Sequence, residues 1–222
     1  MGGFKSDALN SVFSDGVIKI IIAHLIKCSR QMKDDCVNHK IPLYNHEDKI
    51  TNRLTAKYLN IGIGNFRYVP QCSEHFDEAT DLYIGRTDIA VFSCDNFCDS
   101  QAYHIIECKR IDGSNELNNK YINEGVARFF SPTQNPRYSS YYKKNIMFGY
   151  VVKAIDIPSN TGRINEMQNQ ILENTIAGDF LLLCNDGSDY YVYGCQYRPD
   201  IGSIDLLHLF YDFSDVVRLQ NA

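Results

Sequence analysis

The order of helical and strand-like segments is the feature that most limits what this chain can fold into. Two parallel neighbouring strands need a crossover connection, and a helix between a third and a fourth strand candidate supplies one. The order therefore predicts an α/β fold with a mixed central sheet and helices on both faces. The segments are a helix, three strands, a helix and a strand, at 45–60, 65–71, 85–93, 102–110, 115–130 and 145–155.

The length of the chain suits one core with additions at both ends. With 222 residues, the chain is long enough for one sizeable core and short for two. We expect a single domain over residues 1–222. Its core motif region lies at about 45–155, with an N-terminal helical extension at 1–44 and a C-terminal α/β extension at 156–222.

The two extensions have simple patterns. The run VIKIIIAHLI at 17–26 is too short to span a bilayer and includes Lys19 and His24, so it predicts a buried or dimer-forming helix. Nothing near the first residue resembles a signal peptide, and we expect a cytoplasmic protein that does not bind membranes. The C-terminal extension predicts a helix and three strands, at 162–178, 179–184, 190–197 and 204–213.

The charge balance limits the class of partner. Lys and Arg total 22 against 27 Asp and Glu, which gives a net charge of −5. This balance argues against a surface coated for nucleic acid. A local basic groove is still compatible with it, because binding depends on where the charges lie rather than on their sum.

The eight cysteines are spread through the whole chain. In a chain with its own core and no export signal, we expect free thiols rather than disulfides. Cys94, Cys98, His104 and Cys108 have the ligand types of a structural zinc site. The segment CDNFC lacks the usual two-residue spacing, so we expect these residues to belong to the core.

The stretch YHIIECKRID at 103–112 starts apolar and ends with an acid and a base two residues apart. Strand side chains alternate, so Glu107 and Lys109 leave one face while Cys108 leaves the other. A second acid, Asp88, lies 19 residues earlier in TDIAVF, so the two carboxylates fall on neighbouring strands. Paired carboxylates repel unless a cation lies between them, and oxygen ligands suit Mg²⁺ or Mn²⁺.

These residues, in this order of elements, resemble the PD-(D/E)xK nucleases, the restriction-endonuclease-like superfamily. Its signature is an acid on one strand and an acid, any residue and a lysine on the next. GRTDIAVF supplies Asp88 and IIECKRI supplies Glu107, Cys108 and Lys109, although Thr87 stands where the signature has proline. The resemblance covers about residues 45–155 and implies a three-layer restriction-endonuclease-like fold.

The resemblance also implies a role for each residue. Asp88 and Glu107 would hold Mg²⁺ or Mn²⁺ together with the backbone carbonyl of Cys108, while Lys109 would position and polarise the attacking water. Some members carry a further acid on the helix before the sheet, where Glu47 would orient metal-bound water. Alternatively, Glu47 only complements the dipole of its helix.

Basic residues near the motif are candidates for nucleic-acid contacts. Arg110 follows the motif directly and would approach the substrate backbone. Lys120, Glu124 and Arg128 have four-residue spacing on the predicted helix 115–130, so they share one face. That face is either solvated and ion-paired, or it brings Lys120 and Arg128 to a phosphate.

Together these features predict a metal-dependent DNA endonuclease of a bacterial or phage restriction system or another defence pathway. Cutting both strands takes two sites, so we expect a homodimer, and a second protein could supply specificity. One alternative is a catalytically inactive nuclease-fold subunit that binds nucleic acid or another protein. A third function is a zinc-stabilised interaction module built on the segment from Cys94 to Cys108.

Overall fold

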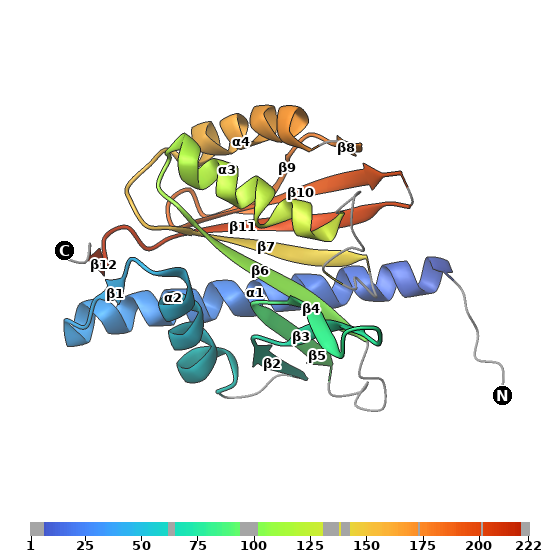
Figure 1. Ribbon diagram of the computed structural model, residues 1–222. Coiled ribbons are helices and arrows are strands. Elements are labelled where there is room, and N and C mark those ends of the chain that lie inside the picture. The colour runs from blue at the N-terminus through green and yellow to red at the C-terminus, as the bar shows by residue number, and fades with distance from the viewer. Residues whose placement is uncertain are drawn as a thin grey trace.

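An eight-stranded mixed sheet forms the centre of the molecule, with helices on both faces (Figure 1). The computed structural model describes residues 7–61, 65–93, 102–130, 138, 143–172, 174–200 and 202–218, and it describes side chains from residue 16 onward except that of His75. This arrangement confirms the predicted α/β class.

The strand order is β2-β5-β6-β7-β11-β10-β8, and β9 also pairs with β10. Strand β7 is parallel to both β6 and β11, and all other neighbours in this sheet are antiparallel. Helix α3 connects β6 to β7, as the predicted crossover requires. The strands are β2 Phe66–Pro70, β5 Ile89–Ser93, β6 Tyr103–Ile111, β7 Lys144–Val151, β8 Thr175–Ala177, β9 Leu181–Asn185, β10 Tyr190–Pro199 and β11 Ile204–Asp212.

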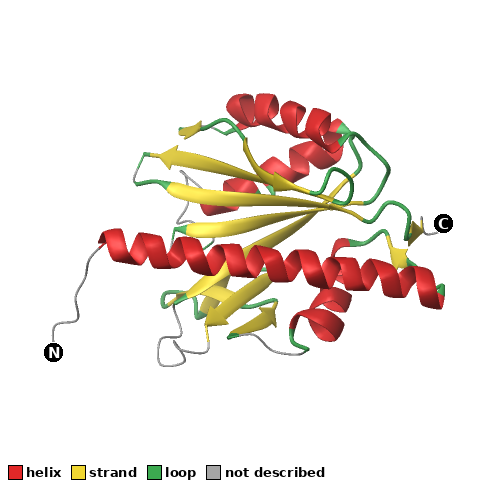
Figure 2. Cartoon of the chain, turned by 180° about the vertical axis from the view of Figure 1, so that it is seen from behind, coloured by secondary structure: helices red, strands yellow, loops and turns green. Residues whose placement is uncertain are grey.

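Helix α1 (Asp7–His39) crosses one face of the sheet over much of its width (Figure 2). Ile18, Ile21, Ile22 and Leu25 are buried and recur at helical spacing, so they form one apolar stripe toward the sheet. The run at 17–26 is therefore a buried helix segment, which is one of the two outcomes predicted for it.

The opposite face carries α3 (Asn115–Asn123) and α4 (Ile157–Ile171). Tyr121 and Ile122 of α3 and Ile164 of α4 pack into a second apolar cluster with residues of β6, β7 and β11. Asp156 caps α4 by accepting a hydrogen bond from Ser159 N, so this helix begins before the predicted start at 162.

The predicted helix 45–60 consists of two parts, α2 (Glu47–Leu54) and a π-helical turn at Thr55–Leu59. The N-cap residue of α2 is His46, whose side chain makes no capping hydrogen bond. The Asn45 Oδ1 atom instead accepts a hydrogen bond of 2.8 Å from Arg110 Nη1, so Asn45 holds a side chain of β6.

The predicted helix 115–130 is also divided. Ser114 caps α3, which ends at Asn123, and a 3-10 turn follows at Val126–Phe129. Gly125 lies between them with φ −119° and ψ −83°, which is outside helical geometry. Lys120 and Arg128 therefore belong to different elements, and the prediction of one shared helical face is wrong.

A hairpin precedes β5 and includes the first two residues of the predicted strand 85–93. Its strands are β3 (Ser73–Asp77) and β4 (Leu82–Arg86), and Asp77 holds the turn by accepting from Ala79 N. Asp88 lies in the short link between β4 and β5 and not inside a strand. Asp88 thus lies directly before the first residue of β5, in the link that follows the hairpin.

Two remaining short strands, β1 (Leu43–Tyr44) and β12 (Val217–Arg218), form a parallel pair that joins the segment after α1 to the segment after β11. In the part of the chain that the structure describes, no helix has both the length and the apolar character to cross a membrane.

Candidate active site

The pairing of β5 with β6 brings Asp88 beside Glu107. Ile89 lies opposite Ile106 in this antiparallel pair, so the next positions along each strand, 88 and 107, are neighbours. Asp88 Oδ2 accepts a hydrogen bond of 2.7 Å from Cys108 N. The predicted proximity of the two acids is therefore present.

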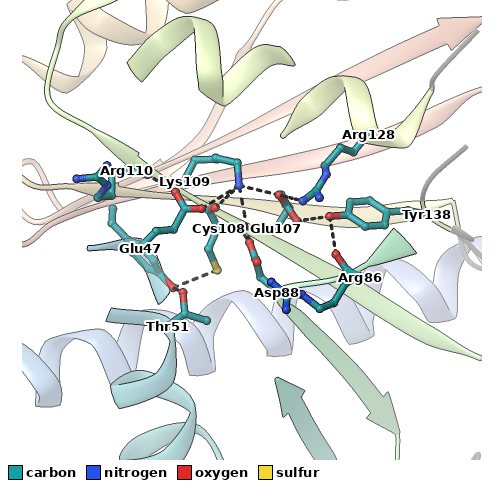
Figure 3. A network of polar contacts seen from close by, with 11 residues as sticks. Glu47, Thr51, Arg86, Asp88, Glu107, Cys108, Lys109, Arg110, Arg128 and Tyr138 are labelled. Carbon is teal, nitrogen blue, oxygen red and sulfur yellow. Dashed lines mark hydrogen bonds and ion pairs between the residues drawn. The ribbon is translucent and has the colours of Figure 1, made fainter. Parts of the chain in front are cut away.

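The ammonium group of Lys109 lies at the centre of the cluster (Figure 3). Its Nζ atom lies 2.8 Å from Glu107 Oε1 and 2.9 Å from the carbonyl oxygen of Cys108. It also lies 3.0 Å from Glu47 Oε1 and 4.0 Å from Asp88 Oδ2. Three carboxylates and one carbonyl thus surround one ammonium.

Glu47 reaches the cluster because it is the first residue of α2, whose N-terminus points at β6. Its second oxygen, Oε2, accepts a hydrogen bond of 3.2 Å from Arg110 N. Both oxygens of Glu47 are therefore directed at β6, which brings this residue to the other acids. In the sequence, the only indication that Glu47 belongs to the site was its position on the predicted helix before the strands.

Glu107 is buried and receives two further donors. Arg128 Nη1 lies 2.7 Å from Glu107 Oε1, and the hydroxyl group of Tyr138 donates to Glu107 Oε2. Tyr138 also lies 3.2 Å from the carbonyl oxygen of Arg86, beside the link that carries Asp88. The sequence suggested that Arg128 contacts a phosphate of the substrate. It did not indicate that Tyr138 binds Glu107.

Burial and the neighbouring charges shift the pKa values of Asp88 and Lys109. Burial raises the pKa of Asp88, and the Glu107 carboxylate raises it further, to about 7. Burial alone would lower the pKa of Lys109, but the carboxylates around it hold the pKa well above its usual value. The ammonium of Lys109 therefore stays charged and balances the acids.

The thiol of Cys108 lies on the other face of β6, inside the core that α1 covers. It accepts a hydrogen bond of 3.1 Å from Tyr150 Oη, and burial raises its pKa well above the usual value. As predicted, the side chain of Cys108 is part of the core, while its backbone N–H and carbonyl groups face the acidic cluster.

His104 and Cys108 are buried, as expected for core residues rather than zinc ligands. Cys94 and Cys98 lie outside the described residues. His104 and Cys108 are four positions apart on one strand, a separation of about 13 Å, whereas two ligands of one zinc ion lie within about 4 Å of each other. His104 Nδ1 instead lies 2.8 Å from the carbonyl oxygen of Lys144.

A pocket of about 300 Å³ opens beside Lys109, and Arg110 and Lys120 line it with His46 and Glu47. Arg110 is held in place by Asn45, while Lys120 forms an exposed ion pair with Glu116. Two of the three predicted nucleic-acid contacts therefore share this pocket. The third residue, Arg128, forms an ion pair with Glu107 instead.

The oxygen atoms of the cluster fit Mg²⁺ or Mn²⁺ in kind. Carboxylate and carbonyl oxygens are the ligands that these ions prefer, and the same atoms already surround one positive charge. Among the described residues, no group of three His, Cys, Asp or Glu side chains has the spacing of a metal site. In this arrangement the Lys109 ammonium lies between the oxygen atoms.

No protein-family model, no curated protein and no solved structure matches the chain. A function for it therefore has to be inferred from the arrangement of these side chains.

Proposed function

We propose that the protein is a metal-dependent endonuclease that hydrolyses phosphodiester bonds in DNA. The observation that carries this proposal is the convergence of Glu47, Asp88 and Glu107 on Lys109 Nζ. These groups come from a helix, a link and a strand, so their meeting is a property of the fold. Acids next to a lysine are the groups that metal-assisted hydrolysis requires.

Asp88 and Glu107, with the carbonyl oxygen of Cys108, would hold Mg²⁺ or Mn²⁺. A bound ion of this kind supplies charge stabilisation for the phosphoryl oxygens and lowers the pKa of a coordinated water molecule. The Lys109 ammonium would donate a hydrogen bond to the attacking water and orient it toward phosphorus. Glu47 keeps Lys109 beside the site, because it binds that ammonium from the side of α2.

The pocket beside Lys109 suits the backbone of a nucleic acid. Lys109, Arg110 and Lys120 present three positive charges to it, against the two carboxylates of Glu47 and Glu124. Phosphate contacts of this kind position a strand without reading its sequence. Substrate phosphates next to the cleaved bond would therefore lie against Arg110 and Lys120.

The second candidate function is a nucleic-acid-binding subunit without catalysis. The observation that favours it is that Glu107 already contacts three donors, from Lys109, Arg128 and Tyr138. A carboxylate held in this way keeps its charge balanced with no metal ion. In that case DNA would bind at the same pocket and remain uncut.

Cleavage assays separate the two functions. Purified protein would be incubated with supercoiled and linear DNA in Mg²⁺, Mn²⁺ or EDTA, next to Lys109→Met and the control Lys153→Met. We expect nicking or linearisation in Mg²⁺ or Mn²⁺, no product in EDTA, and loss of activity only in Lys109→Met, because Lys153 is exposed and outside the cluster. DNA binding without any product in all three buffers would support the inactive subunit and reject the nuclease.

A further inference from the structure

Strand β9 (Leu181–Asn185) lies at the end of the sheet opposite β2 (Figure 1). One edge of β9 pairs with Tyr191–Gly194 of β10, and no strand among the described residues pairs with the other edge. All five side chains of β9 are exposed, with Leu181, Leu182 and Leu183 exposed by 67, 47 and 50 %. The sheet therefore ends in an apolar strand with one open edge.

An open strand edge is a template for pairing with another chain. Monomeric proteins protect such edges with charged residues, with proline or with a covering loop. The sequence of β9, LLLCN, contains neither a charge nor a proline. The lack of protection indicates that another strand covers this edge.

A groove of about 480 Å³ runs beside β9, on the face of the sheet that carries α1. Ile18 of α1, Leu183 of β9 and Leu207 of β11 are among the apolar side chains that line it. Leu183 packs over Gly194, where a Cβ atom would lie only 3.3 Å from Leu183 Cδ1. The groove thus extends the apolar surface of β9 toward the core.

Four charged residues also line the groove, and their signs are balanced. Lys19 and Lys144 are positive, while Asp179 and Asp205 are negative. A strongly charged partner such as DNA would meet no net attraction here. A second copy of the same surface, turned about a twofold axis, would place lysines of one copy near aspartates of the other.

We propose that β9 and this groove form the interface between two copies of the chain. The two β9 strands pair antiparallel about a twofold axis, because a strand edge is complementary to itself only in that arrangement. Each copy covers the leucines of the other, and the two sheets become continuous. This interface lies several strands from β6, so it leaves the candidate site open and does not depend on the proposed nuclease activity.

Sedimentation velocity of the full chain over concentrations from about 1 to about 100 µM tests the interface. We expect a reversible dimer for the wild type. Leu181→Lys combined with Leu183→Lys should raise the dimer dissociation constant at least ~100-fold, because two lysines would be buried without partners. The matched control is Leu82→Lys with Ile84→Lys, where the side chains are 64 and 48 % exposed on the separate strand β4. The control should remain dimeric.

Hydrogen exchange of the wild type at a low and a high concentration tests the same interface without any substitution. We expect the amides of residues 181–185 to gain protection at the high concentration, and those of β4 to stay unchanged. A wild type that is monomeric at every concentration overturns the proposal. So does a dimer that the substitutions in β9 leave intact, and a dimer broken only by the β4 control would place the interface at the hairpin.

Discussion

Glu47 Oε1 and Lys109 Nζ lie 3.0 Å apart, although the two residues are separated by 62 positions in the sequence. This ion pair ties the first turn of α2 to the middle of the sheet. Because the side chain of Glu47 is 27 % exposed, water weakens the contribution of the pair to stability. Its effect should therefore be larger on activity than on folding.

Replacing Glu47 with glutamine tests whether the ion pair affects activity more than stability. Glu47→Gln keeps the shape of the side chain but removes the charge that holds Lys109, so we expect cleavage to slow by about tenfold, or ~1.4 kcal/mol of activation free energy. The free energy of unfolding should fall by less than about 1 kcal/mol. Initial rates of plasmid cleavage and urea unfolding measure the two effects. Glu166→Gln, exposed on α4, is the control, and equal rates in both variants would count against a role for Glu47.

Metal binding should stabilise the folded protein through Asp88. At a hundred times its dissociation constant, Mn²⁺ would add about 2.7 kcal/mol, which is roughly 5–10 °C in melting temperature for a chain of this size. We expect Asp88→Asn to lose this shift, because an uncharged amide replaces an anionic ligand. Thermal melts in a series of Mn²⁺ concentrations make the comparison.

The control for that experiment is Asp81→Asn, in the exposed turn of the hairpin. It should keep the full shift in melting temperature. Without metal, Asp88→Asn should be at least as stable as the wild type, since it removes a carboxylate that lies beside Glu107. An undiminished shift in Asp88→Asn would mean that Mn²⁺ binds elsewhere.

Gly125 leaves room for the stem of Lys109. A Cβ atom at this position would lie 2.5 Å from Tyr121 O and 3.4 Å from Lys109 Cγ. Because a backbone atom has to move, we expect Gly125→Ala to cost about 1–3 kcal/mol of stability and to reduce cleavage as well. Gly162→Ala, in α4 with nothing within 4 Å, should instead stabilise the protein by up to ~1 kcal/mol. Urea unfolding of both variants measures the contrast, and equal changes would reject the steric argument.

His208 is buried in β11 between two tyrosines. Its Nδ1 atom lies 2.7 Å from Tyr121 Oη and its Nε2 atom 3.2 Å from Tyr197 Oη. The hydroxyl group of Tyr197 donates to Gln168 Oε1, so its oxygen is free to accept from Nε2. Burial lowers the pKa of His208 from 6.5 to about 3, and the ring is neutral in the folded protein.

This neutral ring should make the protein sensitive to acid. Between the two pKa values the unfolded chain binds a proton that the folded chain does not, so stability falls as the pH drops from about 6.5 toward 3, by up to ~1.4 kcal/mol per unit. His208→Gln should be less stable at pH 7 by about 1–3 kcal/mol. Its stability should fall less steeply with pH, so the gap to the wild type narrows in acid.

Urea unfolding at a series of pH values from 7 to 4 measures both slopes. His39→Gln, at the exposed end of α1, is the control and should keep the wild-type slope. Parallel curves for the wild type and His208→Gln would show that other groups cause the loss of stability in acid.

The sequence could predict the acids and the lysine together because their arrangement depends on local periodicity. Alternation along β6 separates Glu107 and Lys109 from Cys108, and the distance along the chain places Asp88 next to the start of the neighbouring strand. The mixed sheet followed from the helix between β6 and β7 for the same reason. These relations need only the order and period of the residues.

Other parts of the structure depend on contacts that no period describes. The hairpin was missed because Leu82, Tyr83 and Ile84 are consecutive and all exposed, so the alternation of a half-buried strand is absent. The contact of Tyr138 with Glu107 joins residues 31 positions apart and depends on tertiary packing. The division of the helix after β6 occurs at Gly125, and a single glycine costs a helix only about 1 kcal/mol, so the sequence does not mark it as a break.

Helix α1 precedes the strands of the sheet in the chain, yet its apolar stripe packs with Leu209 and Tyr211 of β11, which follows most of the other strands. About 165 residues separate the end of the helix from the start of that strand, which corresponds to roughly 10–30 s of translation. During this interval the strands β5, β6 and β7 are available to the stripe, but β11 is not. The nascent chain is therefore exposed to aggregation, and a chaperone that shields apolar helices should raise the yield of folded protein.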